Sequence, residues 1–443
     1  MNKLFNTERR VMMEPQRLAS AVAVALLVAA AQQCLATLTP RVEFTEVPLG
    51  QPDVSDEDWR AFLSENLEAD LAPWRSRAPL RANDTLALHE QLLRLRPLPA
   101  VIKLGLVYDN RLYWINRGQA YGEQDGEDGL TKPASPWKEA FHRRVGHLLS
   151  SGRLSLPNVL FVLSTEDNRD RLCAPARGCP APLLSQFKTV GEPDGDDLDI
   201  LLPQFMFANN AMYNHPWHLK KDVAFFRGSP YCSGYWYWKV FTCAKVCPRT
   251  YLAYKSYADS KAMVEPPVLD VGLTRPLYVQ PGTTQCVPAD DVPPSVDRVP
   301  LANHTYYKWL LHLESYTASC RLSQLMMTNS LVLMQQMPFL EYYYRSLRPG
   351  VHYVPFWNMS SPGGINDVYD VVRQLRERDA ADPEYVQAII QRAQTFAVSF
   401  TGASARARYL QDALTAYKGL FADMDPFIEQ LVRELRAQGM RIG

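Results

Sequence analysis

A regular alternation of short apolar strands with helices in the second half of the chain restricts the fold more than any other sequence feature. The pattern predicts strands over residues 223–226, 309–313, 330–334 and 351–355, with helices over 319–328 and 339–347. Such strands pair in parallel, because each intervening helix carries the chain back to the same edge of the sheet. This half is therefore predicted to be a doubly wound α/β domain.

The first half shows a weaker form of the same pattern. Short apolar segments predict strands over 101–107, 111–115 and 159–163, and the segment 137–149 predicts a helix. A chain of 443 residues is too long for one compact core, and a hydrophobic content of 47% is too high for a disordered chain. We therefore expect two α/β domains, each with a parallel sheet.

Sequence signals for the ends of helices suggest how the rest of the chain is organised. Ser55 begins an amphipathic helix over 55–70, and Asp382 with Pro383 begins another whose apolar residues recur at helical spacing. The tail over 405–435 is also predicted to be helical. The expected organisation is a stalk over 39–100, an N-terminal domain over 101–215, a C-terminal domain over 216–395 and helices over 396–443 that brace one domain against the other.

The N-terminus indicates the compartment. An almost unbroken apolar run over 18–31 follows Lys3, Arg9 and Arg10, an order typical of a signal peptide or signal anchor. The run is short for a membrane span of about 20 residues, so the segment 1–38 is either cleaved or kept as a single-pass anchor. We expect the protein in the lumen of the endoplasmic reticulum or Golgi, although its C-terminal residues 440–443 are not a KDEL-type signal.

Cysteines and charge agree with that compartment. Eight cysteines suit an oxidising lumen, and Cys173 and Cys179 are spaced to close a short loop, whereas the others admit several pairings. Sequons for N-glycosylation begin at Asn83, Asn303 and Asn358. Basic and acidic residues number 47 each, which excludes the basic excess of a nucleic-acid-binding chain and suits a neutral sugar ligand.

Ligands of open α/β sheets bind beyond the carboxyl ends of the strands, so polar residues directly after a predicted strand are candidate site residues. Asp167 lies just past the predicted strand 159–163. A carboxylate in this place can act as a general base that takes the proton of an acceptor hydroxyl. The alternative is that Asp167 caps the turn that follows the strand.

Three residues in the second half of the chain are suited to bind an anion. Arg227 follows a predicted strand and precedes Gly228, where a ligand can approach the backbone closely, so its guanidinium suits a diphosphate. A surface salt bridge is the alternative for Arg227. Ser319 and Arg321 open the next predicted helix and combine a hydroxyl, a guanidinium and free backbone N–H groups. Helix capping by Ser319 is the alternative there, and it leaves Arg321 without a role.

Two other clusters have plainer interpretations. The acidic run 194–199 contains two D-x-D triplets, but it does not end a predicted strand, so a solvated acidic turn is preferred to a metal site. Tyr231 and the aromatic residues at 235–238 form either a sugar-stacking wall or packing within a disulfide loop, and packing is preferred. No metal ligand is therefore predicted.

Longer segments around these residues together resemble one family, the Rumi and capsule-associated glycosyltransferases, which include animal protein O-glucosyltransferases and fungal capsule xylosyltransferases. The similarity runs in order over about residues 140–400 and is densest over 216–355. The matching segments include Ala224-Phe225-Phe226-Arg227-Gly228-Ser229, Tyr307-Lys308-Trp309-Leu310, Ala318-Ser319-Cys320-Arg321-Leu322, Asn329-Ser330-Leu331-Val332-Leu333 and Leu347-Arg348-Pro349-Gly350.

The resemblance implies a GT-B-like fold, in which two Rossmann-like domains face a cleft, a UDP-sugar donor, inversion at the anomeric carbon, and no metal or other cofactor. It implies transfer of glucose or xylose to a hydroxyl of a secretory-pathway protein or glycan. The residues that match the family motifs are Asp167 as catalytic base, Arg227, Gly228, Ser229, Ser319 and Arg321 at the donor, and Asp199 and Pro203 near the acceptor groove.

Two places depart from the family pattern. Ser315 stands where relatives usually have glycine, in the loop before Ser319, and residues 169–171 lack a common proline. The chain is therefore either an active transferase or a catalytically inactive lumenal protein of the same fold that binds sugars or nucleotides. Release of UDP from UDP-sugars distinguishes the two.

Overall fold

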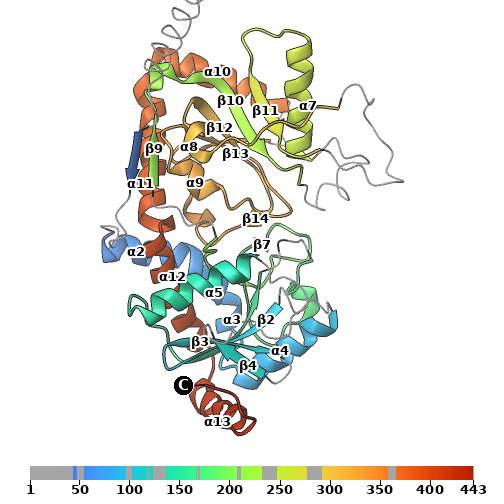
Figure 1. The fold of residues 1–443 in the computed structure, drawn as a ribbon, viewed down its shortest axis with the longest axis vertical. Helices are drawn as coiled ribbons and strands as arrows, with labels where there is room; N and C mark the ends of the chain where they lie inside the picture. Colours follow the sequence, from blue (N-terminus) through green and yellow to red (C-terminus); the bar gives the residue numbers. More distant parts are fainter. Residues whose placement is uncertain are drawn as a thin grey trace, which may run out of the picture. The chain divides into compact units, whose positions relative to one another are not determined.

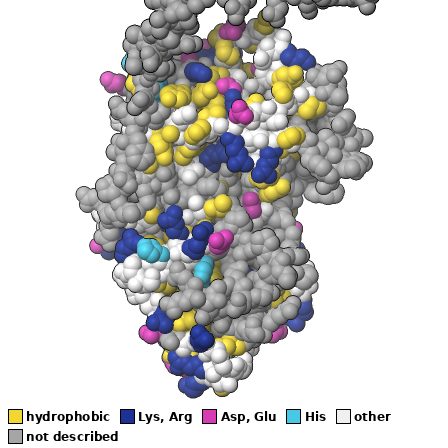
Figure 2. All heavy atoms as spheres, viewed as in Figure 1, with side chains coloured by type: hydrophobic (Ala, Val, Ile, Leu, Met, Phe, Trp, Pro, Cys, Tyr) yellow, Lys and Arg dark blue, Asp and Glu magenta, His cyan; other side chains and the backbone are white. Residues whose placement is uncertain are grey.

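The computed structural model describes residues 43–46, 54–95, 102–116, 119–122, 136–165, 167, 170–206, 211–231, 247–276, 292–357 and 366–442. From Phe44 onward the chain forms one compact unit. The predicted signal segment 1–38 lies outside the described residues. Within the described ranges, no helix is both long and apolar enough to cross a membrane. Acidic and basic side chains both occur on the face shown in Figure 2.

The C-terminal half is built on a sheet of five parallel strands in the order β11-β10-β12-β13-β15 (Figure 1). The chain passes from β10 to β11 on one side and then returns to β12 on the other, so β10 and β12 flank a topological switch point. The predicted parallel sheet is confirmed. Its strands are β10 (Lys221–Gly228), β11 (Leu269–Leu273), β12 (Tyr307–His312), β13 (Leu331–Gln335) and β15 (Val354–Phe356).

The segment 339–347 is not the helix that its sequence predicts. It forms the short strand β14 (Phe339–Leu340) and a 3-10 turn over Tyr344–Ser346. Strand β14 pairs antiparallel with β7 (Lys188–Thr189) of the N-terminal half, a contact that local periodicity cannot reveal. The preceding predicted helix shortens to α9 (Leu322–Met326), and sequence analysis did not find α7 (Pro248–Lys261) or β11.

The N-terminal half contains a six-stranded sheet in the order β4-β3-β2-β5-β6-β8. Only β5, β6 and β8 pair in parallel, so the predicted parallel sheet is wrong for β2, β3 and β4. The reason is a two-residue turn at Asp109 and Asn110, whose φ angles of 49° and 55° join β2 to β3 as a hairpin. The strands are β2 (Ile102–Tyr108), β3 (Arg111–Asn116), β4 (Gln119–Gly122), β5 (Val159–Ser164), β6 (Leu183–Ser185) and β8 (Ile200–Leu201).

Residues 54–95, assigned above to a stalk, instead belong to the folded core. They form α2 (Asp56–Leu63), a π-helical segment (Ser64–Glu68), α3 (Ala69–Arg75) and α4 (Ala82–Leu95). The Trp59 indole donates a hydrogen bond of 2.8 Å to Asp412, and the Phe62 ring stacks on Phe400 at 4.4 Å. The buried Asp70 carboxylate accepts from Lys188, Arg345 and the backbone N–H of Leu201. These contacts tie the segment to both sheet regions.

The last helices connect the two sheets, as predicted. They are α10 (Asp367–Ala381), α11 (Pro383–Thr401), α12 (Ala403–Lys418) and α13 (Met424–Ala437). Helix α11 packs on β13, and α13 packs on β5. The wholly buried Arg406 donates to the carbonyl of Gln204 at 2.6 Å and to the hydroxyl of Ser323 at 3.0 Å, which links the two halves. The domain boundary placed after residue 395 falls inside α11, and the other boundaries remain predictions.

The short disulfide loop is confirmed. Cys173 and Cys179 are bonded, and Cys247 is also in a disulfide. Cys320 is a free thiol, and the predicted pairing of the remaining cysteines lies outside the described residues. Disulfides persist in oxidising compartments, so this part of the fold is compatible with the predicted lumenal environment.

Candidate active site

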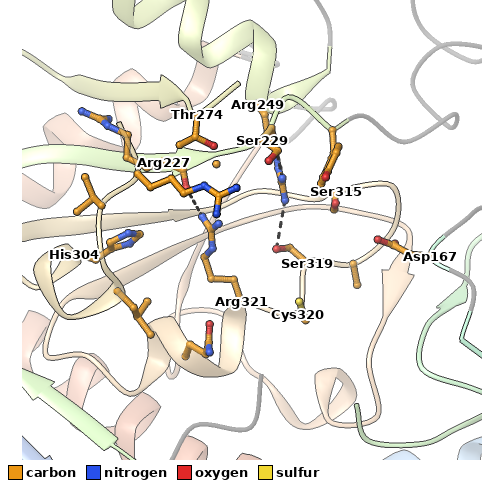
Figure 3. Close-up of a pocket in the computed structure, with 17 residues that line it drawn as sticks. Asp167, Arg227, Ser229, Arg249, Thr274, His304, Ser315, Ser319, Cys320 and Arg321 are labelled. Carbon is orange, nitrogen blue, oxygen red and sulfur yellow. Dashed lines mark hydrogen bonds between the residues drawn. The ribbon is translucent and has the colours of Figure 1, made fainter. Parts of the chain in front are cut away.

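A pocket of about 360 Å³ lies at the carboxyl ends of β10 and β12, at the switch point of the C-terminal sheet. The structure brings together six of the residues predicted from sequence. These are Asp167, Arg227, Gly228, Ser229, Ser319 and Arg321. In Figure 3, Asp167 and His304 lie toward opposite sides of the pocket, with Arg321, Arg249 and Ser319 between them.

Gly228 ends β10 at a point where a larger residue does not fit. A Cβ atom at Gly228 would lie 2.6 Å from Cζ of Phe226, and 3.5 Å from Nη1 of Arg321. The missing side chain lets Phe226 and Arg321 pack against the end of the strand. Arg321 lies over the Phe226 ring at 5.2 Å and donates a hydrogen bond of 2.6 Å to the carbonyl of Arg227.

Arg227 is less available than its sequence position suggested. Its guanidinium forms an ion pair of 2.5 Å with Asp270 and donates to the backbone carbonyls of Asp270 and Phe226 at 2.8 and 2.9 Å. The predicted salt bridge and the predicted pocket position are therefore both observed. Because Asp270 balances its charge, Arg227 contributes less positive potential than an unpaired arginine would.

Arg249 is a pocket residue that sequence analysis missed. It lies in the first turn of α7 and is 4% exposed, and its guanidinium donates to the carbonyls of Ser229 and Leu313 at 3.1 Å and to the hydroxyl of Ser319 at 3.4 Å. Burial, and then the nearby Arg321, lower its pKa to about 9. Its Nε has no hydrogen-bond partner among the described residues. The described residues place no carboxylate at ion-pair distance from Arg249 or Arg321.

Asp167 follows β5 and reaches the pocket from the N-terminal half. The hydroxyl of Thr317 donates to its Oδ1 at 2.6 Å, so its described partner comes from the C-terminal half. Burial raises the pKa of Asp167, while the Thr317 hydrogen bond and the charge of Arg249 oppose that shift. A carboxylate with a raised pKa, beside a cationic wall, is a stronger proton acceptor than an exposed aspartate.

The end of the pocket at His304 is partly apolar. Val299 and Leu301 line the pocket together with His304, and so does the neighbouring Arg298. The His304 ring packs edge-on against Phe225 at 5.0 Å. Burial, and then the charge of Arg321, lower the pKa of His304 to about 3, so its ring is uncharged at neutral pH. The uncharged imidazole and the two apolar side chains suit contact with an uncharged heterocycle.

Asp199 and Pro203, the predicted acceptor-side residues, do not line this pocket. Asp199 borders a separate cavity of about 30 Å³, which is also lined by Thr317, the hydrogen-bond partner of Asp167. Its Oδ2 accepts a hydrogen bond of 2.6 Å from Ser185, and burial and the charge of Asp197 raise its pKa to about 7. Pro203 is buried. Their role at an acceptor stays a prediction.

The acidic run 194–199 is tied into its own loop. Arg171 forms ion pairs with Asp194 and Asp197, and Asp196 accepts from the backbone N–H of Gly191 at 2.8 Å. In the part of the chain that the structure describes, no three His, Cys, Asp or Glu side chains group as metal ligands would. That the protein needs no metal stays a prediction.

Ser315 lines the pocket in an ordinary backbone conformation. It is absent from the described non-glycine residues with positive φ, so the family's glycine is not required there by backbone geometry. Its N–H donates to the carbonyl of Thr317 at 2.8 Å, which closes a tight loop in front of Ser319. Of the predicted aromatic cluster, Tyr231 lines the pocket, and residues 235–238 lie outside the described ranges.

Comparison with known proteins defines the class. The profile of glycosyl transferase family 90 matches residues 204–442, which is more than half of the chain. The chain therefore belongs to glycosyl transferase family 90, and the predicted family is confirmed. The α/β fold class is confirmed by the two sheets, although the N-terminal sheet is mixed and so departs from a Rossmann-like half.

Similar proteins include "O-glucosyltransferase rumi" of Drosophila pseudoobscura pseudoobscura, 26% identical over 55% of this chain and 57% of that protein. "Protein O-glucosyltransferase 1" of Rattus norvegicus is 27% identical over 28% of this chain and 29% of that protein. The chain thus spans just over half the length of the first relative. A solved structure of Anabaena Alr3699/HepE in complex with UDP-glucose aligns with 63% of this chain and 77% of that chain, at 9% identity and a TM-score of 0.34.

Proposed function

We propose that this protein transfers glucose or xylose from a UDP-sugar to a hydroxyl of a secretory-pathway protein or glycan, with inversion and without a metal. One observation carries the proposal. A single pocket holds a carboxylate with a raised pKa, Asp167, and two arginines without a carboxylate partner in the described structure, Arg249 and Arg321. Membership of glycosyl transferase family 90 agrees with this chemistry.

Arg249 and Arg321, which have no carboxylate partner among the described residues, suit a diphosphate. Burying a cation without a counter-ion costs free energy, and a bound anion removes that cost. Arg249 and Arg321 both lie close to Ser319, whose hydroxyl can add a hydrogen bond to a phosphate oxygen. Their planar guanidinium groups match the paired oxygens of a phosphate, and they would supply the positive charge that a divalent metal supplies in other enzymes.

The lining of the pocket supports one direction for the donor. The end at His304 would receive the uracil and ribose, and the two arginines would hold the diphosphate. The transferred sugar would lie toward Asp167. The "O-glucosyltransferase rumi" and "Protein O-glucosyltransferase" names of the similar proteins favour glucose as that sugar. Ser315 lines the pocket near Asp167 and is therefore a candidate for selecting the donor sugar.

The reaction is a single displacement. Asp167 takes the proton of the acceptor hydroxyl as the acceptor oxygen forms a bond to the anomeric carbon. The bond from that carbon to the UDP oxygen breaks at the same time, and attack from the opposite face inverts the configuration. Arg249 and Arg321 stabilise the charge that develops on the departing UDP. Thr317 orients Asp167 through its hydrogen bond.

The proposed compartment is the lumen of the secretory pathway, with or without an N-terminal anchor. It rests on the charged and apolar order of residues 1–38 and on the Cys173–Cys179 disulfide. Protease protection of the full chain in sealed microsomes, with and without detergent, tests the compartment. Extraction by alkaline carbonate then separates a cleaved lumenal protein from an anchored one.

Release of UDP tests the activity. The full chain is incubated with UDP-glucose, UDP-xylose and other UDP-sugars, with protein and glycan acceptors, and with or without EDTA. We expect acceptor-dependent release that EDTA leaves unchanged, and a product whose anomeric configuration is opposite to that of the donor by NMR. Binding of UDP without release from any donor would instead support the catalytically inactive protein.

A further inference from the structure

An aromatic pair lies at the edge of the pocket and is not used by the proposed reaction. Tyr316 is 45% exposed, although large aromatic side chains in a folded chain normally bury most of their surface. Its ring stacks on Tyr231, with centroids 4.8 Å apart and planes inclined by 27°. Tyr231 itself lines the pocket. One ring face is therefore supported by packing while much of the Tyr316 ring remains open to solvent.

The chain places this pair on the Asp167 side of the pocket. Tyr316 lies between Ser315, which lines the pocket, and Thr317, which donates the 2.6 Å hydrogen bond to Asp167. Burial, then Tyr231 and then the charge of Asp167 raise the pKa of Tyr316, so the phenol is uncharged at neutral pH. The nucleoside end at His304 is the opposite end.

The position restricts which substrate can meet the pair. The acceptor must bring a hydroxyl to hydrogen-bond distance of Asp167, so the rest of the acceptor lies across the residues around that carboxylate. A rigid, uncharged and amphipathic ring surface suits the C–H face of a pyranose. Arg275 is the cation that faces Tyr316, and no described carboxylate other than Asp167 faces it.

We propose that Tyr316, supported by Tyr231, is a stacking platform for the pyranose ring of a carbohydrate acceptor. The inference rests on the proposed function and makes it narrower, because it selects a glycan rather than an unmodified protein side chain as the acceptor. Tyr316 would be a specificity residue that holds the acceptor and takes no part in proton transfer.

Steady-state kinetics with methyl glycosides of common pyranoses, short oligosaccharides and a serine peptide tests the proposal. We expect the full chain to use a glycoside acceptor, and Tyr316→Ala to raise the KM for it about three- to tenfold, with kcat, the KM for UDP-sugar and the Kd for UDP changed less than about twofold. Tyr316→Phe should retain the parent KM. Tyr385→Ala, at an exposed tyrosine of α11, is the matched control.

Three results would overturn the platform: an unchanged glycoside KM in Tyr316→Ala, an equal weakening of UDP binding, or turnover of the peptide with none of any glycoside. If no acceptor is turned over, saturation-transfer NMR measures glycoside binding to the UDP-bound protein. Binding that Tyr316→Ala weakens rejects the transfer reaction and keeps the platform. Absence of glycoside binding, or binding that Tyr316→Ala leaves unchanged, rejects the platform itself.

Discussion

The two walls of the pocket differ in the charge that they carry. The N-terminal half contributes Asp167, a single carboxylate whose pKa is raised by burial. The C-terminal half contributes the cations, and among them Arg249 and Arg321 have no carboxylate partner in the described structure. Proton transfer and anion binding are thus assigned to different halves. Substitutions on the two walls should therefore separate turnover from UDP affinity.

The largest expected effect is a loss of turnover when Asp167, on the N-terminal wall of the pocket, is changed. Asp167→Asn removes the group that accepts the proton, so kcat should fall about 100- to 10,000-fold. The Kd for UDP, measured by calorimetry, should change less than about twofold, since the amide keeps the shape of the side chain. A near-normal kcat in Asp167→Asn would assign the base to Glu166 or another carboxylate.

The second largest effect is a loss of UDP affinity when the arginines of the C-terminal wall are changed. Arg321→Lys and Arg249→Lys keep the charge but lose the planar fork, so each should weaken UDP binding about ten- to hundredfold with an unchanged Tm. Arg373→Lys is the matched control, because that arginine is exposed and pairs with Asp370 on the surface of α10. Tight UDP binding by Arg321→Lys would show that the donor site has been misplaced.

A smaller effect is expected at the third arginine. Arg227 is already paired with Asp270, so Arg227→Lys should weaken UDP binding only about two- to fivefold. The comparison with Arg321→Lys under the same conditions is the informative measurement. If both variants lost the same UDP affinity, the ion pair between Arg227 and Asp270 would open when the nucleotide binds.

The smallest expected effect is on the pH dependence of kcat/KM. Asp167 acts when ionised, and burial raises its pKa, so kcat/KM should fall on the acid side at a higher pH than for an exposed aspartate. Thr317→Val removes a hydrogen bond that favours the ionised form and should move this acid limb to still higher pH. An acid limb that stays in place, or moves down, would contradict the assignment of Asp167.

Local sequence signals located much of the site. Arg227 and Gly228, at the end of their strand, and Asp167, beyond its strand, were found because the carboxyl ends of parallel strands face ligands. Ser55 and Asp382 cap their helices by accepting from Asp58 and Tyr385, as their sequences predict. Each of these features depends on neighbours within a few residues, so a single sequence contains the information.

Other parts required the folded chain. Arg249 lies in a helix that sequence analysis did not find, and it joins the pocket only because α7 packs beside β11. The segment 339–347 has the apolar content of a helix, yet it pairs with β7, about 150 residues earlier in the chain. The Asp109-Asn110 turn was a local hairpin signal that sequence analysis passed over.

The sequence alone determined the parallel strands of the C-terminal half, the family, and six of the residues that line the pocket, because these follow from periodicity and from short motifs. Tertiary structure decided which pocket arginines have a carboxylate partner among the described residues, how the N-terminal sheet pairs, and that residues 54–95 belong to the core. Those outcomes depend on contacts between segments far apart in the chain. Charge balance and burial are properties of such contacts, and no local pattern of residues encodes them.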